Sequence, residues 1–319
     1  MSSRDPIGHA VVGSYGLAHS LLAWARCRLW CNDHGYRMLA SSWLHIRHRI
    51  GPMLRGERDK RRYHELFSFP GYMRGLDKLI VLARYRVVEA VDLASPAMTL
   101  EPGTLVVFRN LLADNEENHF AEIRGRGAEV RSALMNITRA RYQPEIVARP
   151  HVALRVRLGD FRAIESNAVL ERGAKNARLP LAWYVDVLEA LRARLGPIPV
   201  RLYSDGEDDD LAPLLLMADV TRSPKQASVT DLLAMSQATA LVSSGSGFSM
   251  WGSYLGGVPR LCFPGQRFVR TLCQDGATDL EPEVACGSEI PEDFSRLLMQ
   301  RLEGSAAGSD SESLANRSS

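Results

Sequence analysis

The feature that most constrains the fold is a regular alternation of strand-like and helix-like segments after residue 150. Short apolar runs predict strands at 151–158, 198–204, 219–223, 239–244 and 258–263. Apolar residues at helical spacing predict helices at 180–196, 209–217, 228–238, 247–256 and 291–302, with Ser228 as the N-cap of its helix. This βα repetition is typical of a doubly wound parallel sheet.

The first half of the chain is less regular but also mixes the two patterns. We expect a helix over 17–31, strands at 37–42 and 104–109, and an amphipathic helix over 117–142. The apolar run in 77–89 fits either a strand or a helix. The fold class is therefore α/β, and a length of 319 residues agrees with two domains.

A domain boundary is expected beside Arg149-Pro150. It divides the chain into an N-terminal domain, residues 1–148, and a C-terminal domain, residues 149–302. The last segment, 303–319, holds six Ser and almost no apolar residues, so we expect a disordered tail there.

Charge is distributed unevenly along the chain. The net charge is only +2, which gives no reason to expect nucleic acid, yet residues 1–86 carry 15 Lys/Arg against 6 Asp/Glu. Within them, 45–64 has seven Lys/Arg and two acids, which fits a solvated loop or a surface for an anionic acceptor. The 35 Arg against 4 Lys fit a GC-rich genome, or selection for bidentate contacts to phosphate.

The compartment follows from several absences in the sequence. Five scattered cysteines form neither a disulfide framework nor a zinc pattern. We find no signal-peptide core and no apolar run long enough for a membrane span. We therefore expect a cytoplasmic protein, with peripheral contact at the inner membrane through the basic first third left open.

Three predicted strands end in polar or glycine-rich residues, where α/β sheets bind ligands. The first end carries Arg155 and Arg157, whose guanidinium groups suit phosphate oxygens, although paired surface arginines would look the same. The second begins with Ser204 and Asp205, which fits a ribose or base contact or an acidic, solvated loop. A metal-binding Asp208 and Asp210 pair is a less favoured interpretation.

The third strand end runs into Ser243-Ser244-Gly245-Ser246-Gly247-Phe248-Ser249 at a predicted helix start. Free N–H groups at a helix N-terminus bind anions, so Ser246, Gly247 and Ser249 are candidates to donate to a phosphate. A hydrolase nucleophile elbow does not fit, because the closing glycine is absent and no histidine follows Ser249. The third glycine of a dinucleotide fingerprint is also missing.

At these residues the chain resembles the fucosyltransferases of the GT-B fold, especially the α-1,2 enzymes of glycosyltransferase family 11 and their bacterial relatives. The resemblance rests on four segments in order, with matching spacing: Arg155-Val-Arg-Leu-Gly-Asp160, Ser204-Asp205, Asp231-Leu-Leu-Ala-Met-Ser236 and Gly245-Ser-Gly-Phe-Ser-Met-Trp-Gly252. The stretch from Gly16 through His19 to Arg26 is similar to the opening of that family, on the acceptor side.

The resemblance implies two Rossmann-like domains, an acceptor-side N-terminal one and a C-terminal one that binds a nucleotide-sugar donor. It implies metal-independent, inverting transfer of fucose from GDP-fucose to a hydroxyl of a glycan or lipid-linked glycan, with no cofactor. Arg157 corresponds to the arginine that holds the diphosphate. Ser246, Gly247, Phe248 and Ser249 match the segment at that phosphate. By comparison with the related α-1,6 enzymes, Glu165 is the candidate general base, and Asp160 braces the loop.

The chain departs from the family pattern at the nucleotide base. Arg155 stands where the family has a histidine that contacts guanine, and Gly206 stands where it has a second aspartate. Three hypotheses therefore remain open: a fucosyltransferase-like enzyme, a transferase or other nucleotide-binding enzyme with a different donor, and a non-catalytic relative that binds a nucleotide or glycan.

Overall fold

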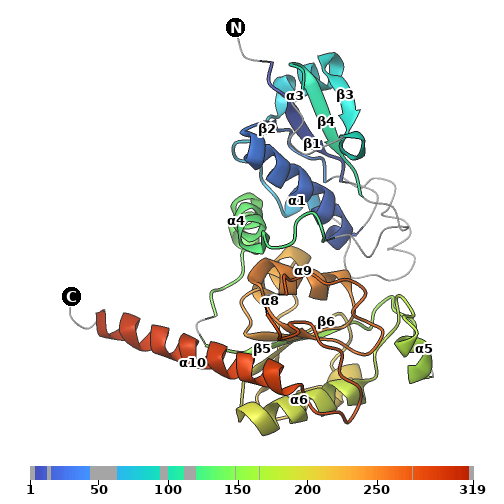
Figure 1. The fold of residues 1–319 in the computed structure, drawn as a ribbon, viewed down its shortest axis with the longest axis vertical. Helices are drawn as coiled ribbons and strands as arrows, with labels where there is room; N and C mark the ends of the chain where they lie inside the picture. The colour runs from blue at the N-terminus through green and yellow to red at the C-terminus, as the bar shows by residue number, and fades with distance from the viewer. Residues whose placement is uncertain are drawn as a thin grey trace. The chain divides into compact units, whose positions relative to one another are not determined.

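The protein folds into two α/β units, Met1–Gln143 and Pro144–Ser319 (Figure 1). The computed structural model describes residues 4–12, 16–43, 63–93, 100–110, 120–147, 149–164, 166–274 and 276–315, with side chains through 304. Each unit is built on its own parallel sheet. The predicted class, α/β with two Rossmann-like domains, is confirmed.

The N-terminal unit contains a sheet in the order β2-β1-β4-β3, in which all pairs of the described strands are parallel. Its elements are β1 (Ile7–Ala10), α1 (Leu17–His34), β2 (Arg37–Met38), η1 (Tyr63–Glu65), α3 (Gly75–Arg84), β3 (Arg86–Glu89), η2 (Ala90–Asp92), β4 (Thr104–Phe108), α4 (Gly127–Ile137) and η4 (Ala140–Tyr142).

Helix α1 packs closely against β1, because Gly8 has no side chain. A Cβ atom on Gly8 would lie 2.3 Å from Sγ of Cys31 and 2.8 Å from Sγ of Cys27. Both thiols are free and buried. The two cysteines, one helical turn apart, therefore act as small apolar residues in this core.

The C-terminal unit contains a sheet in the order β7-β6-β5-β8-β9, again parallel throughout the described strands. Its elements are β5 (Val152–Val156), α5 (Asn167–Glu171), α6 (Leu181–Leu195), β6 (Val200–Ser204), η5 (Asp209–Leu211), α7 (Ala212–Leu215), β7 (Val220–Arg222), α8 (Ser228–Met235), β8 (Ala240–Val242), α9 (Gly247–Gly256), β9 (Arg260–Leu261) and α10 (Glu292–Ala315).

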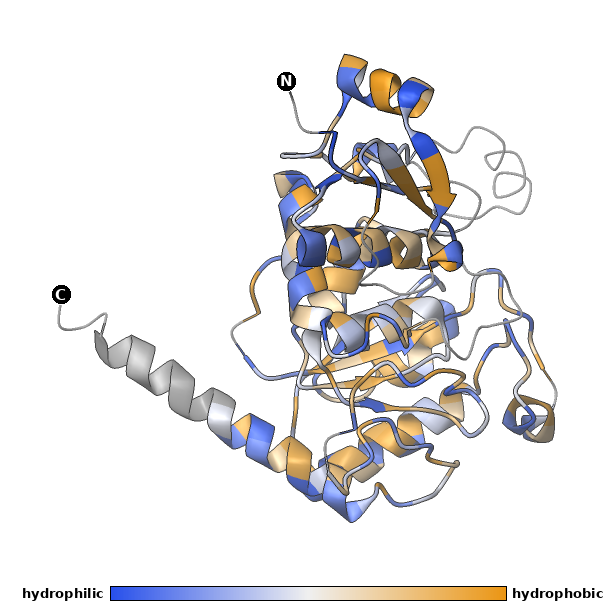
Figure 2. Cartoon of the chain, turned by 45° about the horizontal axis from the view of Figure 1, so that its top comes forward, coloured by the Kyte–Doolittle hydropathy of each residue, from blue (hydrophilic) through white to orange (hydrophobic). Residues whose placement is uncertain are grey.

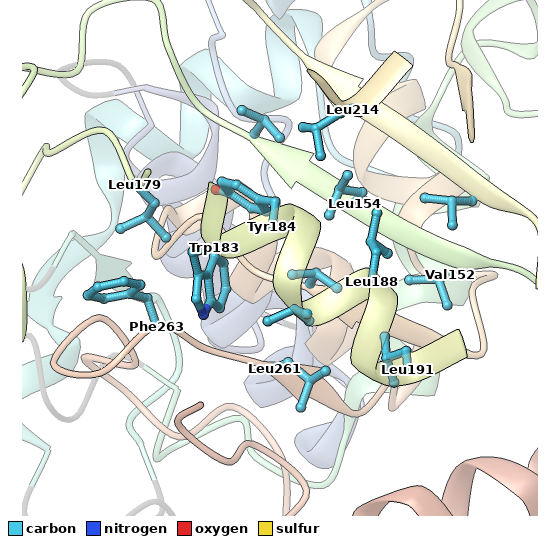
Figure 3. Packing of buried hydrophobic residues seen from close by; sticks show 14 of the residues in the cluster. Val152, Leu154, Leu179, Trp183, Tyr184, Leu188, Leu191, Leu214, Leu261 and Phe263 are labelled. Carbon is cyan, nitrogen blue, oxygen red and sulfur yellow. The ribbon is translucent and has the colours of Figure 1, made fainter. Parts of the chain in front are cut away.

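One hydrophobic cluster of this unit lies between α6 and the central strand β5 (Figure 3). Leu188 and Leu191 of α6 and Val152 and Leu154 of β5 are all fully buried. Trp183 joins them, and its indole N–H donates to the backbone oxygen of Val284 at 2.8 Å. Satisfying this polar atom lets a large aromatic ring fill the core without an unpaired donor.

Several elements differ from the predicted boundaries. The predicted strand 37–42 forms only β2, and the predicted helix 117–142 forms only α4, since residues 120–125 are turns and Gly125 adopts a left-handed φ of 82°. The predicted N-cap, Ser228, is wrong. It is the first helical residue of α8, and the extended residue before it is Ala227. The ambiguous run 77–89 contains both a helix, α3, and a strand, β3.

Helix α10 (Glu292–Ala315) extends past residue 302, where we expected the final helix to end. It overlaps part of the segment 303–319. The disorder of that segment stays a prediction.

A fully buried ion pair fastens the segment that follows β9. Nε of Arg260 lies 2.8 Å from Oε1 of Glu281, and neither side chain is exposed. The Glu281 carboxylate also accepts hydrogen bonds from the backbone N–H of Thr271 at 3.0 Å and of Leu272 at 3.3 Å. Buried charges are tolerated where their remaining hydrogen-bonding capacity is used, as the Glu281 oxygens are here.

Candidate functional site

The carboxyl end of β5 is the switch point of the C-terminal sheet. The chain leaves β5 to build β6 and β7 on one side, and later returns to build β8 and β9 on the other side. In open α/β sheets, ligands bind in the crevice beyond the strand ends at such a point. The three strand ends singled out in the sequence follow β5, β6 and β8, so they adjoin this point.

Arg155 joins the end of β5 to the beginning of α9. Its side chain is only 4% exposed, and its guanidinium carbon lies 5.4 Å from the centroid of the Phe248 ring, in the first turn of α9. The guanidinium Nε is buried and has no hydrogen-bond partner among the described residues. Buried donors are ordinarily paired, so the unused Nε singles out Arg155 as a candidate site residue.

The charge of Arg155 is balanced by two carboxylates. Burial lowers the pKa of Arg155, and the nearby Asp205 and Asp231 oppose this effect. Burial also raises the pKa of Asp231 to about 6, although Arg155 and a 2.9 Å hydrogen bond from Gln226 favour its charged form. The hydroxyl of Tyr184, whose pKa is also raised by burial, interacts electrostatically with the same guanidinium.

Arg157 follows β5 directly and is held by two acidic side chains. Its Nη2 lies 2.5 Å from Oδ1 of Asp160, and its Nη1 lies 2.6 Å from Oδ2 of Asp205. Its guanidinium carbon lies 5.3 Å from the centroid of the Phe161 ring. The Arg157 side chain remains 26% exposed, so a ligand can reach this oriented cation.

Asp205 holds the loop after β5 in place, in addition to pairing with Arg157. Its Oδ1 accepts a hydrogen bond from the backbone N–H of Leu158 at 2.9 Å. A Cβ on Gly159 would lie 2.2 Å from Oδ2 of Asp205, so the carboxylate requires a glycine there. A Cβ on Gly206 would lie 2.5 Å from Cδ1 of Leu158, so this leucine side chain packs closely against the glycine.

The turn between β8 and α9 is organised by serine hydroxyls. Ser246 is the N-cap, and its Oγ accepts from the backbone N–H of Ser249 at 3.5 Å. The Ser249 hydroxyl is fully buried and accepts from the backbone N–H of Ser244 at 3.1 Å. The Ser244 hydroxyl lies 2.8 Å from that of Ser246 and 3.0 Å from that of Ser249. These hydroxyls therefore shape the turn.

The helix start supplies further donors. The first backbone N–H groups of any α-helix have no partner within the helix. In α9 these include the N–H groups of Gly247 and Phe248. Together with the helix dipole they favour an anion at this end.

The other predicted site residues are placed as follows. The Ser204 hydroxyl accepts from the backbone N–H of Gly206 at 3.0 Å. Gly16, the N-cap residue of α1, and His19, exposed in the first turn of α1, belong to the N-terminal unit. Glu165 and most of the basic segment 45–64 lie outside the described residues. The structure thus brings together Arg155, Arg157, Asp160, Asp205 and Phe248.

Two groups at the site were not predicted as functional residues. The sequence places Asp231 in a motif on its helix and Phe161 directly after Asp160, and it assigns neither of them a role at the site. Both contribute through charge or stacking on an arginine. The sequence points to them only through their position in or beside the predicted site segments.

In the described part of the chain, no group of three or more His, Cys, Asp or Glu side chains is arranged to hold a metal ion. Likewise, none of the helices described there combines the length and the apolarity needed to cross a membrane.

Neither a protein-family model nor a curated protein sequence matches this chain. Solved structures similar to it include the fucosyltransferase NodZ from Bradyrhizobium, with 14% identity, a TM-score of 0.42, and coverage of 81% of this chain and 94% of NodZ. The E. coli heptosyltransferase WaaC with ADP has 12% identity and a TM-score of 0.44, covering 94% of this chain and 100% of WaaC. POFUT1 in complex with GDP has 10% identity and a TM-score of 0.37, covering 82% and 98%.

Likenesses at such low identity concern the fold alone. NodZ is a fucosyltransferase and WaaC is a heptosyltransferase, and neither is described as a family 11 enzyme. The resemblance to glycosyltransferase family 11 therefore stays a prediction. The function of this chain therefore has to be inferred from its own residues.

Proposed function

We propose that this chain is a glycosyltransferase that binds a nucleotide-sugar donor at the carboxyl end of β5. The observation that carries the proposal is the contact of Arg155 with Phe248, which brings the end of β5 to the N-terminus of α9. Arg157 follows two residues later, oriented by Asp160 and Asp205. An oriented guanidinium and free helix N–H groups at one strand end suit the diphosphate of a nucleotide sugar.

The same groups would assist the chemical step. When the acceptor oxygen attacks the anomeric carbon, the bond from that carbon to the diphosphate breaks, and negative charge grows on the leaving group. Arg157 and the first N–H groups of α9 would stabilise this charge without a metal ion. Attack from the opposite side inverts the sugar carbon. The acceptor proton passes to a general base, for which we propose Glu165.

We further propose GDP-fucose as the donor, because four sequence segments resemble those of the fucosyltransferases. The N-terminal unit, with Gly16 and His19, would take the glycan or lipid-linked glycan acceptor. Arg155 in place of the base-contacting histidine favours a second candidate, which is a transferase for another nucleotide sugar. The third candidate is a relative that binds the nucleotide or glycan without transferring it.

The first test is thermal unfolding of the full chain with GDP, UDP, GDP-fucose and GDP-mannose, followed by an assay of donor hydrolysis. A bound ligand stabilises the protein by RT ln(1 + [L]/Kd), so the true nucleotide raises the Tm. We expect Arg157→Ala to reduce donor turnover about 100-fold or more, as the loss of one charge-stabilising donor does in other enzymes. The matched control is Arg194→Ala, which removes an exposed arginine paired with Glu289 in the same unit.

The outcomes separate the candidates. Turnover of GDP-fucose that is lost in Arg157→Ala and kept in Arg194→Ala supports the enzyme. A Tm shift with no turnover of any donor favours the binding relative. Wild-type turnover in Arg157→Ala contradicts the assigned site. No shift with any nucleotide contradicts both transferase candidates and a nucleotide-binding relative, and it leaves only a relative that binds a glycan alone.

A further inference from the structure

Helix α3 of the N-terminal unit turns an apolar face away from the core. Val81 is its only fully buried residue, and it packs in the cluster formed by Ile7, Leu39, Leu105 and Val107. Leu76, Leu79 and Ile80 follow the i, i+3, i+4 spacing of one helix face, on the side away from Val81. Leu76 is 72% exposed and Leu79 is 63% exposed. A surface helix ordinarily turns such a face towards the core.

The exposed apolar surface continues onto β3. This strand is the last in the order β2-β1-β4-β3, so its outer edge has no neighbour among the described strands. Val87 in β3 is 54% exposed, and Val91, just beyond it, is 71% exposed. Figure 2 shows the apolar residues along α3 and β3. Single exposed apolar side chains are ordinary, but several of them on consecutive elements point to an interaction site. We refer to residues 74–91 as the α3–β3 surface.

Basic side chains border the apolar face. Arg74, Arg84 and Arg86 are exposed. Arg86 makes only a loose ion pair with Glu101, at 3.6 Å between largely exposed groups. Asp77 is the only acid between residues 74 and 88. The half of the surface formed by α3 and the start of β3 is therefore positively charged as well as apolar.

We propose that the α3–β3 surface binds an anionic lipid bilayer. Leu76, Leu79 and Val87 would enter the boundary between headgroups and acyl chains, and the arginines would contact lipid phosphates. A second copy of the chain fits less well, because a symmetric contact would bring two positively charged copies of this surface together. The proposal does not depend on the proposed function, since it concerns a different surface and a different ligand.

The test is co-sedimentation of the full chain with vesicles, either of phosphatidylcholine alone or with one third phosphatidylglycerol. We expect binding to the anionic vesicles that falls as salt rises, because exposed charges are screened. The double variant Leu76→Ser/Leu79→Ser should weaken this binding about tenfold or more, since it removes two inserted side chains. Arg84→Glu should weaken it by about tenfold on anionic vesicles, because it reverses one surface charge.

The matched control is Leu216→Ser, which changes an 86% exposed leucine in the C-terminal unit and should bind like the wild type. Unchanged Tm and nucleotide response in the variants show that they remain folded. The proposal is overturned if the wild type stays in the supernatant with both vesicles, or if Leu76→Ser/Leu79→Ser binds like the wild type. It is also overturned if sedimentation velocity shows a dimer that the same variant dissociates.

Discussion

Arg155 and Arg157 lie two residues apart yet have different environments. A strand over the predicted range 151–158 would place both side chains on one face. However, β5 ends at Val156, so only Arg155 is held by the sheet, where it is buried against Phe248. Arg157 lies beyond the strand and pairs with two carboxylates at the surface. The residue types and positions were predictable, but their burial was not, because it depends on the end of the strand and on a helix more than 90 residues away.

Asp231 gives a prediction on pH. Burial raises its pKa to about 6, so the folded protein holds this proton at pH values where the unfolded chain has released it. The group therefore lowers the stability of the fold as pH rises from about 4 to about 6. We expect the Asp231→Asn variant to lack this decline. The unfolding free energy of the wild type, relative to that of the variant, should therefore fall by about 1–2 kcal/mol between pH 4 and pH 6.

The measurement is urea unfolding of both proteins between pH 4 and pH 7. The relevant quantity is the difference between the two curves, since other titrating groups then cancel. A difference that stays constant across the range would show that Asp231 titrates as an ordinary surface carboxylate.

At the scale of elements, the strand and helix around residues 239–256 were predicted almost as they occur, because apolar period and glycine placement are local signals. The structure has β8 at Ala240–Val242 and α9 at Gly247–Gly256. The hydroxyl network of the turn between them was not predictable, since serine has many possible local partners. Similarly, the helical period of α3 does not reveal that its apolar face points outward.

Gly245 in this turn provides a second prediction. Its φ is 67°, and a Cβ there would lie 3.1 Å from the backbone oxygen of Gln266. Gly245→Ala should therefore cost about 1–3 kcal/mol of unfolding free energy and lower nucleotide affinity, because the start of α9 must shift. Unfolding in urea and a nucleotide titration measure the two effects.

Gly257 provides the control. It has a similar φ of 60°, at the C-cap of α9, but a Cβ there would meet nothing within 4 Å. Gly257→Ala should show the cost of the backbone strain alone, with nucleotide affinity unchanged. Equal losses of affinity in both variants would contradict a special role for the turn before α9.

At the scale of the molecule, the chain divides into the units Met1–Gln143 and Pro144–Ser319, whereas the change from irregular to regular patterning places the expected domain boundary at residues 148–149. The assignment of donor to one unit and acceptor to the other stays a proposal. Patterns along a chain identify units, but the ligand of each unit depends on side chains that only the fold brings together.

This assignment predicts where a nucleotide acts. In hydrogen exchange followed by mass spectrometry, a nucleotide that raises the Tm should slow exchange in peptides covering β5, β6 and α9. At about 100 times Kd the stabilisation is about 2.7 kcal/mol, which slows globally exchanging amides about 100-fold. Peptides from β1 and β4 are the internal control and should exchange at their original rate. Equal protection in β1 and β4 would contradict a donor site confined to the C-terminal unit.

The buried pair of Arg260 and Glu281 has a consequence for how this protein can diverge. Removing either partner alone leaves an uncompensated charge in the core, which costs about 3–5 kcal/mol, a large share of the stability of an ordinary domain. Evolution can therefore replace the two residues together. It can replace them one at a time only after another mutation has stabilised the fold enough to offset the loss. Among homologues of this chain, the two positions should covary.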